Sequence, residues 1–343
     1  MYLLNNIKKN GLRVGAPFLY WSGYFDRILE KSQDRSFILM YHRVVNDQFQ
    51  DNANIGIGIE HFEDQVRYIK NKMHPIAMRD LVGMIASGDS LPPKAVAITF
   101  DDGYSDVYDH AFPILNNYRV PATLFVTTGY ISTSKILWLD QVREIVFNAR
   151  NDKIFPSEFS EFWISSDGDS KRGVLSLGRG REAAYDRVIE WFKEMDSALV
   201  NRAVEKLRMI LNSGDGNVER HTLATWEQVK EMSDYGIEIG THTVNHFILG
   251  RLSEDELKYE LRESKRVIEK NTGKEAQGLA IPYGQSIHFN EKVIQTAKNM
   301  GFRYVCTAIT GSVFSISDVF LLKRISLPNS QLPIALWKIC KYA

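Results

Sequence analysis

Residues 94–104 read KAVAITFDDGY, the most informative stretch in a chain of 343 residues. The apolar or β-prone run 96–100 leads directly into Asp101 and Asp102, and a glycine follows. A short continuous apolar run that ends in a turn signal is typical of a strand buried on both faces of a parallel sheet. Because α/β proteins bind ligands and carry out catalysis at the carboxyl ends of such strands, the two carboxylates are candidate functional groups. The alternative is that Asp101 caps the following helix and Asp102 is solvated.

The same order of strand and helix recurs along the chain. Further apolar runs predict strands at 36–45, 122–126, 237–240, 278–281, 303–307 and 324–327. Amphipathic patterns between these runs predict helices, and such alternation is expected for parallel strands with covering helices. About seven strand–helix units favour a barrel over an open sheet, so the sequence predicts an α/β fold of the barrel type.

The predicted barrel carries additions at three places. We expect an N-terminal arm over 1–34, the barrel over 35–330 and a C-terminal helix over 331–343. From about 131 to 219 the alternation stops, and helical patterns are joined by a stretch rich in Ser, Gly and Asp. We interpret this stretch as an insertion of helices and loops, which forms either a lid or wall on the substrate side or a decoration of the fold.

The composition indicates a globular protein without a nucleic-acid partner, because 42 basic and 42 acidic residues cancel. The two cysteines, Cys306 and Cys340, lack the spacing of a metal site. No apolar run is long enough for a signal peptide or a membrane span, so we expect a cytoplasmic protein. Aromatic and aliphatic residues beside basic ones at 15–25 and 332–343 leave peripheral membrane association open, with packing against the main domain as the alternative.

A second candidate site follows another predicted strand. The motif HTVNH places His242 and His246 four positions apart, so that one helical turn would put both imidazoles on one face. This spacing suits two nitrogen ligands of one metal ion, and we expect the motif on the same rim of the barrel as the aspartates. Two histidines and one carboxylate would form a metal site with a position left for water, while the second carboxylate would be the general base. The alternative is a structural cluster of Asp and His without metal.

A third element, AIPYG at 280–284, also follows a predicted strand. A Pro-Tyr-Gly turn at a strand end can direct a backbone N–H toward a developing oxyanion. Taken alone, it is an ordinary turn.

Together these elements carry a family resemblance. TFDDGY at 99–104, HTVNH at 242–246 and AIPYG at 280–284 are similar, in this order, to the first three motifs of the polysaccharide deacetylase family, the NodB-homology carbohydrate esterases. The similarity extends over 36–327, apart from the insertion. It implies a distorted (β/α) barrel of about seven strands and the metal-dependent removal of acetyl groups from an N-acetylated sugar.

The resemblance also implies roles for single residues. Asp101 would be the general base, while Asp102, His242 and His246 would bind a divalent metal, usually zinc. The backbone N–H of Tyr283 would help to hold the oxyanion.

The chain departs from the family pattern at two positions. The third motif often begins with an arginine that orients the base, and Ala280 stands in its place. The family usually supplies a general-acid histidine from a late Leu-x-His motif, whereas no histidine follows His288 here. Residues 39–42 read LMYH, a form found near the N-terminus of members that act on poly-N-acetylglucosamine. We therefore hypothesise that His42 protonates the leaving amine or lies over the acetate, the alternative being a histidine that caps a buried strand end.

Three more side chains are candidates for substrate binding. Arg43 and Arg324 would bind an acidic substrate group or neutralise the carboxylates of the site. Trp138, at the start of the insertion, would stack on a sugar ring.

The sequence therefore predicts a metal-dependent hydrolase that removes N-acetyl groups from an acetamido sugar of a polysaccharide or glycoconjugate precursor. A deformylase or imidase on the same scaffold is one alternative. A catalytically silent carbohydrate-binding protein is another, although such a protein has no need of both a ligating and a free carboxylate.

Overall fold

The computed structural model describes residues 9–32, 34–46, 55–163, 173–214, 222–327 and 329–343. The chain divides into two compact units. The first unit combines residues 1–133 with 223–343, and the second comprises residues 134–222. The second unit thus occupies the part of the chain in which we expected the insertion.

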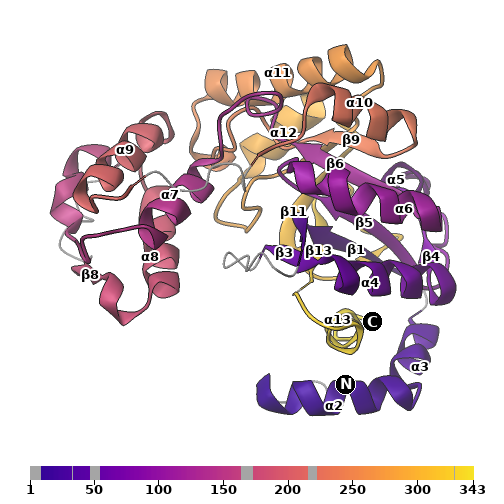
Figure 1. The fold of residues 1–343 in the computed structure, drawn as a ribbon. Helices are drawn as coiled ribbons and strands as arrows, with labels where there is room; N and C mark the ends of the chain where they lie inside the picture. Colours follow the sequence, from indigo (N-terminus) through magenta and orange to yellow (C-terminus); the bar gives the residue numbers. More distant parts are fainter. Residues whose placement is uncertain (1–8, 33, 47–54, 164–172, 215–221, 328) are drawn as a thin grey trace. The chain divides into compact units, whose positions relative to one another are not determined.

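Seven parallel strands of the first unit close into a barrel (Figure 1). In spatial order they are β1 (Arg35–Tyr41), β5 (Ala95–Phe100), β6 (Ala122–Val126), β9 (Glu238–Thr241), β10 (Gly278–Ala280), β11 (Tyr304–Thr310) and β13 (Leu322–Ser326). The barrel is closed because β1 pairs with β5 on one side and with β13 on the other. Two short strands outside the ring of seven also pair with barrel strands. They are β4 (His74–Pro75), parallel to β5, and β12 (Val313–Phe314), antiparallel to β1. The predicted (β/α) barrel of about seven strands is confirmed.

Helices follow the strands and cover the outside of the barrel (Figure 1). They are α4 (Ile59–Lys72), α5 (Met78–Ser87), α6 (Phe112–Tyr118), α10 (Trp226–Asp234), α11 (Glu254–Thr272) and α12 (Glu291–Asn299). Helix α11 begins at a reciprocal capping box that Ser253 and Glu256 form. It ends at Gly273, whose φ of 72° is the left-handed conformation that glycine adopts without steric cost.

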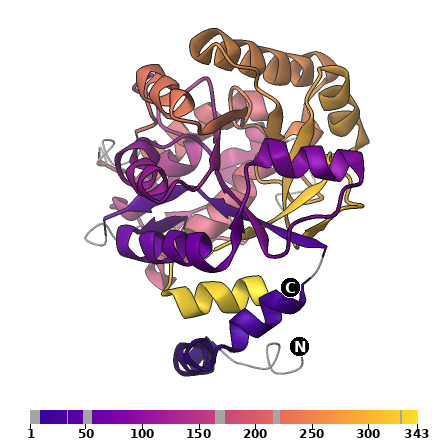
Figure 2. The ribbon, with the colours of Figure 1, turned by 90° about the vertical axis from the view of Figure 1, so that its right-hand side faces the viewer.

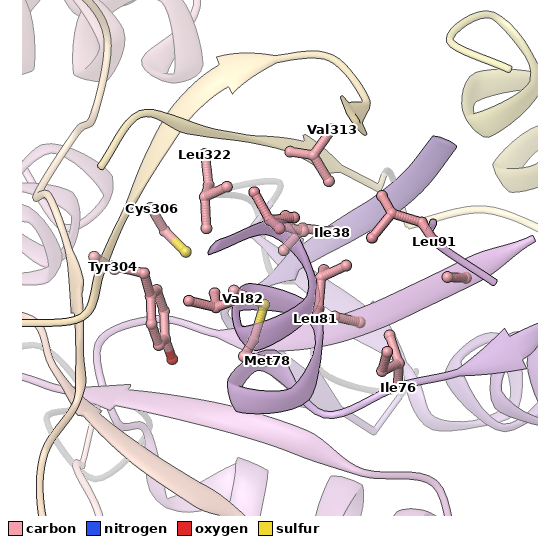
Figure 3. Close-up of a cluster of buried hydrophobic side chains, with 14 of the residues drawn as sticks. Ile38, Ile76, Met78, Leu81, Val82, Leu91, Tyr304, Cys306, Val313 and Leu322 are labelled. Atoms are coloured by element: carbon pink, nitrogen blue, oxygen red, sulfur yellow. The ribbon is translucent and has the colours of Figure 1, made fainter. Parts of the chain in front are cut away.

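The hydrophobic core lies inside the barrel (Figure 3). Buried side chains from six of the seven strands and from α5 form one cluster, which includes Ile38, Ala97, Phe125, Ala280, Tyr304 and Leu322. Close packing fixes the small residues as well. A Cβ atom at Gly278 would lie 2.2 Å from the ring of Tyr304, so only glycine fits at this position.

The second unit has its own core. It contains α7 (Trp138–Phe147), α8 (Arg181–Lys193), α9 (Val200–Ile210) and a two-stranded antiparallel pair, β7 (Lys153–Ile154) and β8 (Leu175–Ser176). Residues 183–212 have a helical pattern throughout, but they form two helices, because α8 ends near Glu194. The backbone N–H of Asp196 instead donates to the carbonyl of Phe162, and a new helix follows.

The terminal segments of the first unit pack against each other. The N-terminal arm forms α2 (Lys9–Trp21) and α3 (Tyr24–Lys31), and the C-terminal helix is α13 (Leu332–Cys340). Figures 1 and 2 show α13 beside α2 and α3, in agreement with their contacts. Among the described helices, none combines the length and the apolar character that crossing a bilayer requires.

Candidate active site

Five side chains singled out from the sequence lie directly after barrel strands. His42 follows β1, Asp101 and Asp102 follow β5, His242 follows β9, and Tyr283 lies three residues beyond β10. Because all four strands are parallel, these residues gather at the carboxyl rim of the barrel. The predicted shared rim is confirmed.

Asp102, His242 and His246 form a compact buried cluster. The Nε2 atoms of His242 and His246 lie 3.4 and 3.3 Å from Oδ1 of Asp102. One ligand atom from each residue lies within 4.8 Å of the other two. All three side chains are buried, so the cluster forms a preformed site rather than a chance meeting of surface groups.

The hydrogen bonds of the two imidazoles indicate what this cluster binds. Nδ1 of His242 lies 2.7 Å from the carbonyl oxygen of Ala280, and a carbonyl can only accept, so Nδ1 carries the proton. The lone pair of Nε2 therefore faces Asp102. Burial, which outweighs the nearby carboxylates, lowers the pKa of His242 to about 4, so this ring is neutral at pH 7. Nδ1 of His246 lies 3.2 Å from the hydroxyl oxygen of Tyr283, the second partner that orients a ligand ring.

These donors fit a divalent cation. Oδ1 of Asp102 is buried and has no hydrogen-bond partner within the described part of the chain. It faces the lone pair of Nε2 of His242, and a cation between these two atoms would make their approach favourable. One carboxylate and two imidazoles form a donor set that suits zinc, with a further position left for water or substrate.

The segment 242–246 is not the helical turn that the histidine spacing predicted. It is an irregular loop in which Thr243 and His246 have left-handed φ angles of 70° and 59°. The prediction of a shared helix face is therefore wrong, although the two rings still meet. The local reason is that side-chain oxygens replace helical bonds, since the backbone N–H of His246 donates to Oγ1 of Thr243 at 3.0 Å.

Glu260 on α11 holds this loop from behind. Its Oε2 accepts hydrogen bonds from the backbone N–H groups of Val244 and Asn245 at 2.8 and 2.9 Å, and its Oε1 accepts from Nδ2 of Asn245 at 2.6 Å. Sequence reasoning missed this residue. Its position in the helix could have indicated that it is buried, because Glu260 lies three residues after Leu257 and four before Ser264, on the buried face of α11.

Asp101 lies beside the cluster and is held by a buried arginine. Nη1 and Nη2 of Arg324 donate to Oδ1 and Oδ2 of Asp101, both at 2.7 Å, while its Nε donates to the carbonyl of Thr307. Burial alone would raise the pKa of Asp101, but the charge of Arg324 and its hydrogen bonds outweigh burial and keep the pKa below its usual value. Asp101 is therefore an ionised carboxylate of fixed orientation.

Of the two predicted roles of Arg324, the structure shows the second, because the guanidinium neutralises a carboxylate of the site. Arg324 is 1% exposed and its donors are used by Asp101, Thr307 and Thr99. It takes the place of the arginine that the third motif lacks, because Ala280 stands at that position. The signal in the sequence was the alternation in β13, where Leu322 and Arg324 are buried while Lys323 between them is exposed.

The other two predicted substrate residues also have structural partners. Nε of Arg43 lies 2.7 Å from Oδ2 of Asp106, and its guanidinium covers the ring of Tyr104. Trp138 is 3% exposed and stacks on Phe192 in the core of the second unit. These contacts assign both side chains to packing, and they contradict the prediction that Trp138 offers a face to a sugar.

His42 differs from these residues because it is half-buried at the rim. The pKa values of Asp101 and Asp102, which burial would raise, are lowered by several neighbouring charges, and His42 is among them for both. Tyr41 and Phe100 are paired in register between β1 and β5, so His42 and Asp101, which directly follow them, leave neighbouring strands at the same level of the rim.

Comparison with known proteins identifies the family. The sequence model of the family described as polysaccharide deacetylase matches residues 88–149 and 198–305, which contain all three motifs. The chain belongs to the polysaccharide deacetylase family. It is accordingly a hydrolase of amide bonds, and the matched region omits the middle of the predicted insertion.

Named relatives of this deacetylase agree with the assignment. YxkH of Bacillus subtilis (strain 168), whose name places it in the same family, is 20% identical over 289 residues, which cover 84% of this chain and 70% of YxkH. A poly-beta-1,6-N-acetyl-D-glucosamine N-deacetylase of Staphylococcus aureus is 27% identical over 126 residues. That alignment covers 33% of this chain and 43% of the S. aureus enzyme.

Solved structures share the fold of this deacetylase. The Streptococcus pyogenes deacetylase PplD, solved in complex with acetate, superposes with a TM-score of 0.57 and 20% identity over 89% of this chain and 97% of PplD. IcaB from Ammonifex degensii gives a TM-score of 0.57 with 18% identity and the same coverage.

Substitution of the arginine tests its role in positioning Asp101. We expect Arg324→Lys to lower kcat/KM by about 100-fold, because a lysine keeps the charge but loses the fork that fixes both carboxylate oxygens. Arg43→Lys alters a comparable ion pair with Asp106 and is expected to leave kcat/KM within about threefold. Thermal denaturation of both variants verifies folding. An equal loss in the two variants, or none in Arg324→Lys, contradicts the assignment.

A second prediction concerns the loop that carries the ligands. Glu260→Ala leaves two buried N–H groups and an amide without acceptors, so we expect affinity for zinc to fall by about 10–100-fold. Glu260→Gln keeps one oxygen for the two N–H groups and is expected to recover most of the affinity. Competition with a chromophoric chelator measures these affinities, and Glu263→Ala on the exposed side of α11 is the control. Unchanged affinity in Glu260→Ala would show that the loop holds its shape without this carboxylate.

Proposed function

We propose that this deacetylase removes N-acetyl groups from an N-acetylated sugar of a polysaccharide or glycoconjugate precursor, and that it does so with a bound zinc ion. One observation carries the proposal. A buried set of metal-binding donors, Asp102, His242 and His246, lies beside a carboxylate, Asp101, that is ionised and oriented by Arg324. Amide hydrolysis needs these two functions next to each other, an electrophile and a general base.

The residues of the site divide the reaction between them. When bound, the divalent cation would polarise the acetamide carbonyl and acidify a water molecule. Asp101 would accept the proton of that water as its oxygen attacks the carbonyl carbon. The bidentate contact with Arg324 fixes the direction in which this carboxylate accepts. The backbone N–H of Tyr283 would stabilise the negative charge on the former carbonyl oxygen.

Collapse of the tetrahedral intermediate breaks the C–N bond, and the amine needs a proton to leave. We propose that His42 supplies it, because its half-buried imidazole lies at the rim beside both carboxylates. The products are acetate and a free amino sugar, and the proton taken by Asp101 balances the one given by His42.

Two features support the substrate class. The S. aureus relative is named as a deacetylase of a β-1,6-linked polymer of N-acetylglucosamine, so a polymer of this sugar is the first candidate. The equal numbers of acidic and basic residues give no preference for a charged substrate.

Acetate release tests the proposed reaction. The enzyme is incubated with N-acetylglucosamine oligomers and with lipid-linked acetamido sugars, and we expect acetate to form. A chelator is expected to abolish acetate release and added zinc to restore it, because the proposed reaction needs the bound cation to polarise the carbonyl and acidify the water. Full activity in the presence of chelator refutes metal dependence. Formate release from a formylated sugar, without acetate, would instead favour the deformylase alternative.

Replacement of His42 tests the assignment of the proton donor. We expect His42→Ala to lower kcat by about 100–10,000-fold, the usual range for a general acid, while one equivalent of zinc stays bound. His74→Ala, at an exposed histidine of β4, is the control. Activity is measured by acetate release and metal content by elemental analysis. Wild-type turnover in His42→Ala rejects the role, and loss of zinc would indicate a ligand instead.

A further inference from the structure

The outer face of α2 exposes two large aromatic side chains. Phe18 is 74% exposed and Trp21 is 83% exposed, the highest values among the aromatic residues that the structure describes. They are three positions apart and therefore lie on the same face of the helix. We call this pair the α2 aromatic face.

The α2 aromatic face does not hold the helix in place. Ala16 is fully buried, and the ring of Tyr20 lies 6.4 Å from that of Tyr68 on α4, so the inner side of α2 makes the contacts with the body of the protein. Phe18 and Trp21 project from the other side. Two exposed aromatic rings on one helix face cost solubility, so a contact partner is the expected reason for them.

The two sequence segments that contain α2 and α13 are basic. Residues 9–25 and 327–343, which contain α2 and α13, include the basic residues Lys9, Arg13, Lys338 and Lys341 and no acidic residue. In the whole chain, by contrast, basic and acidic residues are equal in number. These 34 residues therefore carry a local excess of four basic residues, and the nearest acidic residue in sequence is Asp26 of α3.

The two lysines of α13 are not neutralised within the protein. In the described part of the chain, no carboxylate lies within ion-pair distance of Lys338 or Lys341, and Nζ of Lys341 covers the ring of Trp337 at 4.3 Å. Burial, and then the charge of Lys341, lower the pKa of Lys338. An anion beside this pair would relieve both the repulsion and the desolvation.

We propose that α2 and α13 form a docking surface for a membrane that contains anionic lipids. Figures 1 and 2 show the two helices side by side, so the aromatic face and the basic residues belong to one end of the first unit. Phe and Trp side chains insert at the boundary between headgroups and acyl chains, and lysines nearby attract anionic headgroups. This inference goes beyond the proposed reaction and does not depend on it.

The size of the aromatic face favours lipid over a protein partner. Two aromatic side chains bury about 150–250 Å² each, whereas a stable protein interface buries about 800 Å² on each partner. Peripheral membrane binding needs less area, because electrostatic attraction adds to the insertion of a few apolar groups.

Vesicle sedimentation of the full-length protein tests the proposal. Vesicles of phosphatidylcholine alone are compared with vesicles of equal parts phosphatidylcholine and phosphatidylglycerol. We expect binding to the anionic vesicles, at least about tenfold weaker binding to the neutral ones, and loss of binding at high salt. Equal partition to both vesicle types, or to neither, overturns the proposal.

Two pairs of substitutions locate the surface. Phe18→Ser with Trp21→Ser and, separately, Lys338→Gln with Lys341→Gln are each expected to lower binding by about tenfold. Ile287→Ser with Ile316→Ser is the matched control, because these side chains are 77% and 92% exposed elsewhere. Acetate release from a soluble oligomer is expected to stay unchanged in all three, which separates lipid binding from catalysis. If Phe18→Ser with Trp21→Ser instead binds lipid normally but abolishes dimerisation in light scattering, the face is an interface between two copies and the proposal is wrong.

Discussion

The buried ion pair between Asp101 and Arg324 is the constraint on which the site depends. The two residues are 223 positions apart in the chain and meet through two hydrogen bonds of 2.7 Å. A buried carboxylate without a cation would take up a proton or destabilise the fold, and it would then be useless as a base. Because buried ion pairs add little net stability compared with apolar packing, the placement of this pair in the core is better explained by the chemistry of Asp101 than by folding.

The closure of the barrel is what brings the catalytic groups together. Strand β1 pairs with β5 and β13, so His42 and Asp101, at the ends of their strands, and Arg324, within β13, come from neighbouring strands. The proposed acid, the base and the arginine that orients the base therefore come from three adjacent strands. In the proposed mechanism this arrangement accounts for the two departures from the family motifs, with His42 after β1 in place of the late histidine and Arg324 of β13 in place of the arginine of the third motif.

The sequence predicted the barrel and the ligand set because both leave local signals. Apolar runs that end in polar residues mark buried parallel strands, and the histidine spacing marks a shared site. The partners of these residues leave no such signal. Glu260 and Arg324 act through contacts with residues far away in the chain. In the sequence they are visible only as charged residues at positions where the periodicity of the helix or strand predicts a buried side chain. Trp138 shows the converse, because an aromatic residue at the start of a helix looks the same whether its ring faces a ligand or, as here, a core.

The backbone of the rim shows that stability was given up for geometry. Asp102, Thr243, His246 and Tyr283 all have left-handed φ angles, between 59° and 73°, although none is glycine. Each such residue costs about 1–3 kcal/mol and persists only where its surroundings fix it, and a β-branched threonine is especially unfavourable. The hydrogen bonds of Glu260 supply such fixing for the histidine loop. The strained residues thus include Asp102 and His246, two of the three side chains that would bind the metal. The strain lies at residues whose side-chain orientation the proposed chemistry requires.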